Sequence, residues 1–519
     1  MAVKGLTDVP IFRLPEELLL HIALQLPDSS RPVHLMRLSL TSRKLRPAAQ
    51  EALHRVAKLA VSCGCHPRIN AVVRLLRTLY DRPDLAAKVK TLRFRTVRQN
   101  VKALYEEQDF DLTPLRVRGM LELESMGYSK AHPWCKSLEN SIESAFAGLL
   151  VLQIPSLSRL DFWVKDHVRG PPSSECITGL FGSMCVPDKV IHAWKGLRHL
   201  TTGDSPVLKC GIPFNNLTSL NLKSVSIGTV LRLNGRGSLQ GTEHLDSLTL
   251  TVSMQFAERA LVNKAEVHLG DLFDALDCRK LRNLSMMLIN DGYHMDDDTL
   301  TYFDSSYFME QLAIFEHSLT ALNITLEGIE DGTELDWLLD SCTVPNPSWK
   351  NFKCLTQLVV PQAFFLDMSG REGLENTDPC KWTDLPPKLE RLEILYPQQE
   401  VESWAYSFLP DTANGRFKLP SFKRLTLTCR DDVGTPLSYF TTDIDEIWLA
   451  LATHGIETFA GCQTKDISKN LAQAYQEQES SENVEQCDES DSEGQDQDED
   501  GAESDDENDD MPDLIDPLD

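Results

Sequence analysis

Apolar residues near the start of the chain recur at the spacing of short amphipathic helices. Leu18, Ile22 and Leu26 follow one another every four residues, and two further apolar stretches predict a second and a third helix. The third helix is expected to begin near Pro47, with inner positions at Ala48, Ala49, Ala52, Val56 and Leu59. Three such helices bury little apolar surface on their own. The pattern therefore predicts a small helical module over residues 9–60, either a partner-binding unit or an ordinary cap on the rest of the chain.

Two motifs of this module resemble the F-box family. The first is Leu14-Pro15-x-Glu17-Leu18-Leu19-x-x-Ile22, and the second is Ser42-Arg43-Lys44-Leu45-Arg46 at the family's interval. The resemblance covers about residues 9–53 and implies a three-helix module. Such a module docks on a Skp-type adaptor and, through it, on a cullin–RING ubiquitin ligase. By the resemblance, the adaptor-binding residues at or beside the interface are Leu14, Pro15, Leu18, Leu19 and Ile22. Leu38 and Leu45 complete that interface or support it from within the module.

The middle of the chain repeats the pattern apolar-x-x-apolar-x-apolar. The hexads begin at Val89, Leu157, Leu197, Leu217, Leu245, Leu281, Leu319, Leu355, Leu389 and Phe422, and a degenerate copy covers Ile456–Phe459. From Leu245 onward, successive copies begin 33 to 38 residues apart. A single hexad carries little information in a leucine-rich chain, but this nearly constant interval indicates a repeated structural unit.

Each hexad has the alternation of a short strand with one buried face. The residues between hexads are numerous enough to cross back over a sheet, so neighbouring strands are expected to pair in parallel. Stacked units of this kind form a curved α/β solenoid. The pattern resembles an irregular leucine-rich-repeat horseshoe over residues 61–465. With the N-terminal helices, the whole chain combines α+β organisation with an α/β solenoid.

The repeat is interrupted between Phe94 and Leu157. Leu112, Leu115 and Val117 fit an extra strand, which Pro114 limits to an edge or a loop. Residues 134–152 have the apolar spacing of one amphipathic helix. Three polar stretches are expected as loops or connectors, at 170–174, 234–237 and 291–298.

Charge separates a tail from the rest of the chain. The net charge is −27 over 519 residues, yet residues 477–519 hold 21 acidic residues and neither Lys nor Arg. The remaining chain therefore carries a net charge of only −6. A segment so poor in apolar residues is expected to stay disordered, and we place this acidic tail at 466–519. The lack of a basic excess disfavours a nucleic-acid partner.

Polar positions of the strands are expected on the concave side of the solenoid, where repeat proteins bind partners. These positions carry both signs of charge. The arginines among them are candidate contacts for an unknown target protein: Arg159, Arg198, Arg282, Arg391 and Arg424. For any single one of these residues, plain solvated surface is the simpler interpretation.

Neither metal, cofactor nor catalytic chemistry is indicated by the motifs. The closest cysteine cluster, Cys63-Gly-Cys65-His66, has no further ligands at matching spacing, so the 13 cysteines are interpreted as reduced thiols. Gly-x-Ser-x-Gly, His-Glu-x-x-His and phosphate-cradling Gly-Lys-Ser/Thr motifs do not occur, so an enzyme is not expected. The sequence predicts neither a signal peptide nor a membrane span. We therefore expect an intracellular location, cytoplasmic, nuclear or both.

Two binding functions stay open after these exclusions. The first is the substrate-recognition subunit of a Skp–cullin–F-box type ubiquitin ligase, in which the front module holds the ligase and the solenoid holds the target. The second is an interaction scaffold that uses the same modules without a ligase. Capture of a purified Skp-type adaptor separates the two.

Overall fold

The structure is a computed structural model of the whole chain. It describes residues 10–26, 31–59, 71–165, 180–181, 187–202, 216–225, 242–289, 303–327, 342–364, 384–409, 419–430, 437–462 and 465–478, with short gaps inside several of these ranges. Four sequence features lie outside the described residues: the Cys63–His66 cluster and the three stretches at 170–174, 234–237 and 291–298. Residues 479–519 of the acidic tail also lie outside them.

The chain begins with a helical module that has its own small core. It consists of the short 3-10 helix η2 (Pro10–Arg13) and three helices, α1 (Glu16–Leu24), α2 (Arg31–Thr41) and α3 (Arg46–Arg55). Both α1 and α2 pack on α3. Small residues on α3 allow this close approach, because Ala48, Ala49 and Ala52 are all buried. Leu19 and Leu45 join Ala48 in one cluster, and Ala23 and Leu35 join the other two alanines in a second.

The third helix is shorter than predicted. It ends at Arg55, and the next three residues form strand β1 (Val56–Lys58), which pairs in parallel with β2 (Thr91–Val97). The prediction that Val56 and Leu59 occupy inner helix positions is therefore wrong. The sheet ladder continues through Lys90, whose N–H donates to the Arg55 carbonyl. Pairing with β2 thus overrides the helical periodicity, and the sheet begins inside the range assigned to the helical module.

The rest of the described chain is organised around one sheet of 13 strands. In spatial order, after β1 and β2, they are β3 (Arg159–Lys165), β4 (His199–Thr202), β5 (Ser219–Val225), β6 (Ser247–Ser253), β9 (Asn283–Ile289), β11 (Ala321–Glu327), β13 (Gln357–Pro361), β14 (Arg391–Leu395), β15 (Arg424–Cys429), β16 (Glu457–Cys462) and β17 (Lys465–Asn470). Neighbours from β1 to β16 are parallel, and β17 joins β16 in antiparallel orientation. The sheet is the mostly parallel one expected for an α/β solenoid-like fold.

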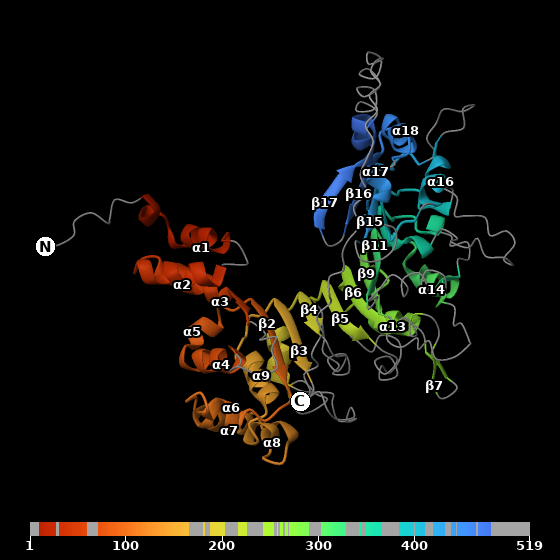
Figure 1. Cartoon of the computed structure of the whole chain (residues 1–519). Helices are drawn as coiled ribbons and strands as arrows, with labels where there is room; N and C mark the ends of the chain where they lie inside the picture. The colour runs from red at the N-terminus through yellow and green to blue at the C-terminus, as the bar shows by residue number, and fades with distance from the viewer. Residues whose placement is uncertain are drawn as a thin grey trace, which may run out of the picture.

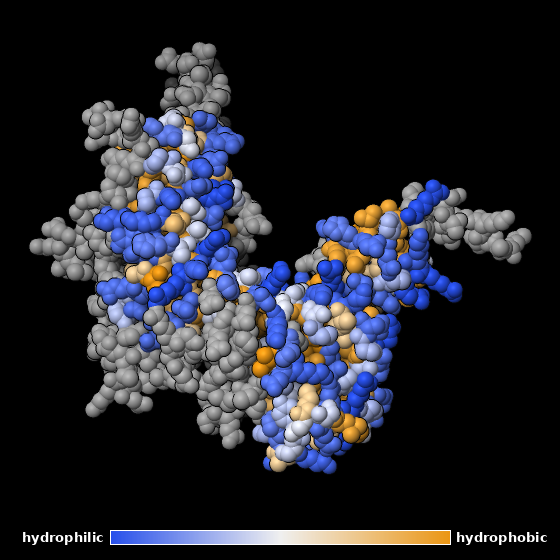
Figure 2. Space-filling model, turned by 180° about the vertical axis from the view of Figure 1, so that it is seen from behind, coloured by the Kyte–Doolittle hydropathy of each residue, from blue (hydrophilic) through white to orange (hydrophobic). Residues whose placement is uncertain are grey.

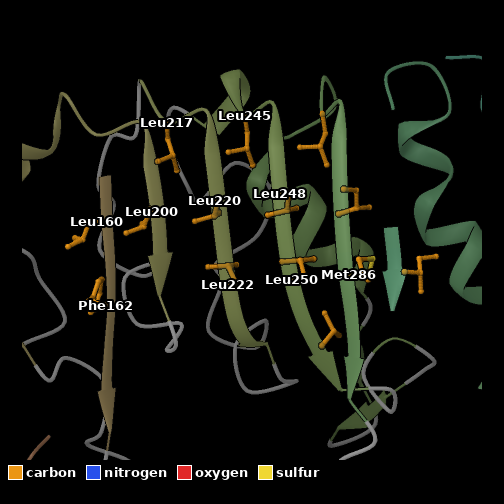
Figure 3. Packing of buried hydrophobic residues seen from close by; sticks show 14 of the residues in the cluster. Leu160, Phe162, Leu200, Leu217, Leu220, Leu222, Leu245, Leu248, Leu250 and Met286 are labelled. Atoms are coloured by element: carbon orange, nitrogen blue, oxygen red, sulfur yellow. The ribbon is translucent and has the colours of Figure 1, made fainter. Parts of the chain in front are cut away.

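Leucines of successive hexads stand side by side in this sheet. Leu248 is in register with Leu220 on one side and with Leu284 on the other, and the same row continues through Leu322 and Leu358. Figure 3 shows part of this row, with Leu200, Leu220 and Leu248 side by side, and a second row with Leu222, Leu250 and Met286. The predicted parallel pairing of the hexads is confirmed, including the degenerate copy, which lies at β16. One continuous apolar core runs along the sheet.

Helices and short 3-10 turns connect the strands. They are α4 (Ala71–Asp81), α5 (Pro83–Ala86), α6 (Lys102–Glu106), α7 (Thr113–Ser125), α8 (Pro133–Glu139), α9 (Glu143–Leu152), α10 (Asp188–Trp194), η4 (Thr242–His244), α13 (Leu269–Leu276), α14 (Ser305–Leu312), η5 (Ala313–Phe315), η6 (Trp349–Asn351), η7 (Gln362–Phe364), α16 (Glu400–Tyr406), α17 (Tyr439–Thr442) and α18 (Ile447–Thr453). Two small pairs complete the structure, β7 (Ala260–Val262) with β8 (Ala265–Val267) and β10 (Phe303–Asp304) with β12 (Cys342–Thr343). The sheet curves, with α13, α14 and α16 along its outer side (Figure 1).

Two predictions for the interrupted region are wrong. The segment with Leu112, Leu115 and Val117 is not an edge strand but the start of α7, in which Pro114 occupies the first turn. Proline is tolerated there because the first amide hydrogens of a helix have no partner within the helix. The predicted single helix over 134–152 is two helices, α8 and α9, because Ser141 adopts a left-handed backbone conformation with φ 54° and breaks the helix.

Ordered structure also continues past the predicted start of the acidic tail. Strand β17 and a helix at 471–478 lie beyond residue 465. Asn470 caps this helix, since its Oδ1 accepts a hydrogen bond from the Gln473 amide at 3.1 Å. Leu471 and Ala472 are buried against the core of the sheet. The sheet and the residues packed on its core therefore extend at least to residue 478.

Candidate functional site

The predicted adaptor-binding residues divide into exposed and buried groups. Leu18 is 49% exposed and Ile22 is 45% exposed, and both lie one turn apart on α1. Pro15 is also exposed, whereas Leu14 and Leu38 are half-buried. In contrast, Leu19 is 4% exposed and Leu45 is 7% exposed. These two residues belong to the core of the module and are not exposed at its surface.

Helix α2 carries a second exposed apolar stripe, outside the residues predicted to bind the adaptor. Val33 is 51%, Met36 56% and Leu40 78% exposed, at the i, i+3, i+7 spacing of one helix face. Figure 2 shows hydrophobic side chains gathered on these N-terminal helices. We refer to Leu18, Ile22, Val33, Met36 and Leu40 as the module surface. Five large apolar side chains exposed on a module of this size are typical of a docking surface.

The module is fixed to the sheet by polar contacts as well as by the chain itself. Glu51 on α3 forms an ion pair with Lys88, at 2.7 Å, just before the strand β2. Within the module, Arg46 donates through Nε to the Ser39 carbonyl at 3.2 Å and joins the end of α2 to the start of α3. The module surface therefore has a defined position relative to the first strands of the sheet.

The five predicted target-binding arginines do not form one cluster. Arg159, Arg391 and Arg424 are the first residues of their strands, whereas Arg198 and Arg282 precede β4 and β9 by one residue. Arg391 and Arg424 are direct register neighbours. Six strands lie between β3 and β14 in the order of the sheet. A single ligand site built from all five residues is therefore not supported.

Two of these arginines are already engaged within the chain. The Arg424 guanidinium lies 4.1 Å from the centre of the Phe459 ring, a cation–π contact between β15 and β16. The Arg282 Nε atom lies 3.5 Å from a carboxylate oxygen of Asp246. Both guanidinium groups can still contact a partner. The Asp246 carboxylate partly balances the charge of Arg282, and the Arg424 guanidinium is partly covered by the Phe459 ring.

A basic groove lies where the strands β2, β3 and β4 begin. Its volume is about 560 Å³, and its lining residues are Lys90, Pro155, Ser156, Leu157, Ser158, His192, Gly196, Arg198 and His199. Backbone hydrogen bonds set the spacing of its wall, because the Ser158 amide donates to the Lys90 carbonyl and the Arg198 amide donates to the Ser158 carbonyl, each at 2.8 Å. We call this feature the β2–β4 groove.

The pKa of His199 is affected by burial and by the positive charges at the groove. Its Nδ1 atom is buried and has no hydrogen-bond partner among the described residues. Burial lowers the pKa of His199, and the positive charges of Arg159 and Arg198 lower this pKa further. The imidazole is thus held neutral by the same charges that would attract an anion.

In the part of the chain that the structure describes, no three His, Cys, Asp or Glu side chains come together in a group that could hold a metal ion. No helix in the same part is long and apolar enough to cross a membrane.

Comparison with known proteins does not assign the chain to a family. No family model matches it, and no curated protein matches it in sequence.

Proposed function

We propose that the chain is a substrate-recognition subunit of a Skp–cullin–F-box type ubiquitin ligase. The helical module docks on a Skp-type adaptor, and the curved sheet binds the target protein. Catalysis belongs to other subunits, and this chain acts by holding a target lysine close to the ubiquitin carrier, which raises the effective concentration of the two reactants.

The observation that carries the proposal is the module surface. Leu18 and Ile22 match the family motif and are both exposed, although the module has few apolar residues to spare for its core. Burying one such side chain contributes about 1.5–3 kcal/mol, so leaving five in water is unfavourable without a partner. Val33, Met36 and Leu40 add exposed apolar side chains on α2, which packs on α3 as α1 does, and they further support docking.

The proposal is tested by capturing a purified Skp-type adaptor with the full chain and with the double variant Leu18→Asp, Ile22→Asp. Placing two carboxylates in a desolvated apolar interface costs several kcal/mol. We therefore expect adaptor affinity to fall by at least a hundredfold, measured by calorimetry or by surface binding. Both residues are about half exposed in the free chain, so the fold should lose little stability.

The matched control is the double variant Val117→Asp, Leu121→Asp. These residues are 52% and 61% exposed on α7, and they also lie four residues apart on one helix face. The control should bind the adaptor as the unchanged chain does. An equal loss of adaptor affinity in both double variants would contradict the proposal. The absence of adaptor binding by the unchanged chain would also contradict it and would favour a scaffold that does not join a ligase.

A further inference from the structure

Among the described residues, the β2–β4 groove is lined by cationic side chains and by no carboxylate. Three other cationic side chains near strand starts are paired with carboxylates: Arg93 with Asp161 at 3.0 Å, Arg282 with Asp246 at 3.5 Å and Lys423 with Glu390 at 3.1 Å. Arg424 at the start of β15 lies over the Phe459 ring instead. No carboxylate among the described residues pairs with Lys90, Arg159 or Arg198, and none lines the groove.

Sheet geometry concentrates these unbalanced charges. Lys90 and Arg198 precede β2 and β4, so they are two strands apart, or about 10 Å between backbones at ordinary strand spacing. His192 on α10 and His199 complete the wall between them. Lysine and arginine at this distance, with no neighbouring carboxylate, form a site for extended anionic chains. The buried and unpartnered Nδ1 of His199 leaves one further polar atom without a ligand.

The anionic chain that fits best is part of this same molecule. The acidic segment, residues 477–519, contains 21 acidic residues and neither Lys nor Arg. A nucleic acid is a poorer partner, because the net charge of −27 repels it. We propose that the acidic segment binds in the β2–β4 groove of its own chain and contacts Lys90 and Arg198 through its carboxylates.

The length of the acidic segment is sufficient for this contact. Residues 479–519 span at most about 140 Å when fully extended. From β16, next to which the described chain ends, the groove at β4 is eight strands away, or about 40 Å along the sheet. Since both partners belong to one chain, binding is intramolecular, and individually weak ion pairs suffice to populate it.

The inference does not require the helical module to bind an adaptor, because it concerns only the groove and the acidic segment. One consequence does rest on the proposed function. Arg198 is also among the predicted target contacts, so the bound segment occupies part of the surface on which a target would dock. A target must then displace the segment. Moderate salt should release the segment from the groove, so the affinity of the chain for its target should increase over the range of salt concentration that does not yet weaken the target complex.

The test is zero-length coupling of carboxylates to lysines in the full chain, followed by mass spectrometry after digestion at acidic residues. We expect amide links between Lys90 and carboxylates of residues 479–519 at low salt, and at least fivefold fewer at 0.5 M NaCl because salt screens the attraction. The link between Lys423 and Glu390, which already lie 3.1 Å apart, serves as the internal standard for reagent activity.

Two variants decide whether the groove is responsible. Arg198→Glu should reduce the Lys90 links at least fivefold, and Arg198→Gln should reduce them less. Arg282→Glu is the matched control, because Arg282 occupies the equivalent position before β9 and is equally exposed but outside the groove. It should leave the Lys90 links within twofold of the unchanged chain, and thermal unfolding checks that all variants are folded.

Three results would overturn the proposal. The first is the absence of links from Lys90 to the acidic segment while the internal standard forms. The second is an equal effect of Arg198→Glu and Arg282→Glu. The third comes from mixing chains of normal and heavy nitrogen: links that join the two isotopes would show that the segment of another copy, and not of the same chain, fills the groove. None of these three results affects capture of the adaptor. Failure of the groove proposal can therefore be distinguished from failure of the proposed function.

Discussion

Burial controls the reactivity of cysteine side chains in this fold. Cys278, just after α13, is 1% exposed, and burial raises the pKa of its thiol to about 12. An unfolded cysteine has a pKa near 8.5, so the thiolate fraction at pH 8.5 is on the order of a thousandfold lower in the folded chain. We therefore expect N-ethylmaleimide to modify Cys278 about a thousand times more slowly in the native than in the denatured chain, followed by peptide mass spectrometry.

The half-buried Cys354 is the internal comparison and should be modified before Cys278 in the native chain. Equal rates for Cys278 in the native and denatured chains would show that the α13 region opens readily. The shift also affects stability. Because the folded pKa lies above the unfolded one, the protonated thiol contributes fully below about pH 8.5, and this contribution is lost as the pH rises toward 12.

Residue-scale features of the candidate site were only partly predictable from the sequence. The motif and the helical spacing both single out Leu18 and Ile22, and the structure places both side chains at the surface. Leu19 belongs to the same motif but is buried, since adjacent residues on a helix face different directions. The β2–β4 groove was not predicted, because Lys90, Ser158 and Arg198 lie far apart in the sequence. Only the register of the strands brings them together.

At the scale of the element, strands that repeat a buried leucine row were predictable and single exceptions were not. Each hexad predicts the same three buried positions, so an error in one copy is corrected by its neighbours. The start of α7 lacks such support. Its leucines fit the hexad template over a few residues, and the helical spacing of Leu115, Gly119 and Leu123, all buried, becomes evident only over a longer window. The Asp111 carboxylate, which accepts from the Thr113 amide at 2.8 Å, is the available start signal.

The shared leucine row makes a local prediction about stability. Leu284 in β9 is 2% exposed and lies between Leu248 and Leu322. Leu284→Ala removes buried methyl groups and leaves a cavity, which costs about 2–5 kcal/mol. Since repeat units depend mainly on their neighbours, amide hydrogen exchange should accelerate more in β6 and β11 than in β2 and β15.

The control for this variant is Leu121→Ala on α7, where the side chain is 61% exposed. It should change the unfolding free energy by no more than about 0.5 kcal/mol. If Leu284→Ala accelerated exchange equally from β2 to β15, the sheet would unfold as one cooperative unit and nearest-neighbour stacking would not describe it.

At the scale of the whole molecule, the sheet is closed by different elements at its two ends. At one end, β1 is only three residues long and continues directly from the helical module. At the other end, β17 reverses the strand direction and the helix at 471–478 packs on the core. Open strand edges bind further strands and promote aggregation, so both ends restrict edge-to-edge association. Strand β17 was not predicted, because its sequence, Lys465-Asp466-Ile467-Ser468-Lys469-Asn470, is polar and lacks the alternating apolar pattern of the other strands. It also stands just before the acidic residues and was assigned to the tail with them.

This closure can be tested by two truncations, one ending at residue 478 and the other at residue 462. Both lack 479–519, and residues 463–478 carry two lysines and two acidic residues, so the truncated chains have equal net charge. The longer chain keeps β17, the Asn470 cap and the buried Leu471. The shorter chain exposes the backbone edge of β16 and uncovers part of the core.

We expect the chain ending at 478 to elute as a single species of constant mass in size-exclusion chromatography with light scattering. The chain ending at 462 should form larger species whose mass increases with concentration, because the free edge of β16 pairs with other chains. Its thermal unfolding should also begin at a lower temperature, since Leu471 and Ala472 no longer cover the last repeat. If both truncations stayed monomeric with the same unfolding temperature, β17 and its helix would be dispensable, and closure of the sheet would have to come from β16 itself.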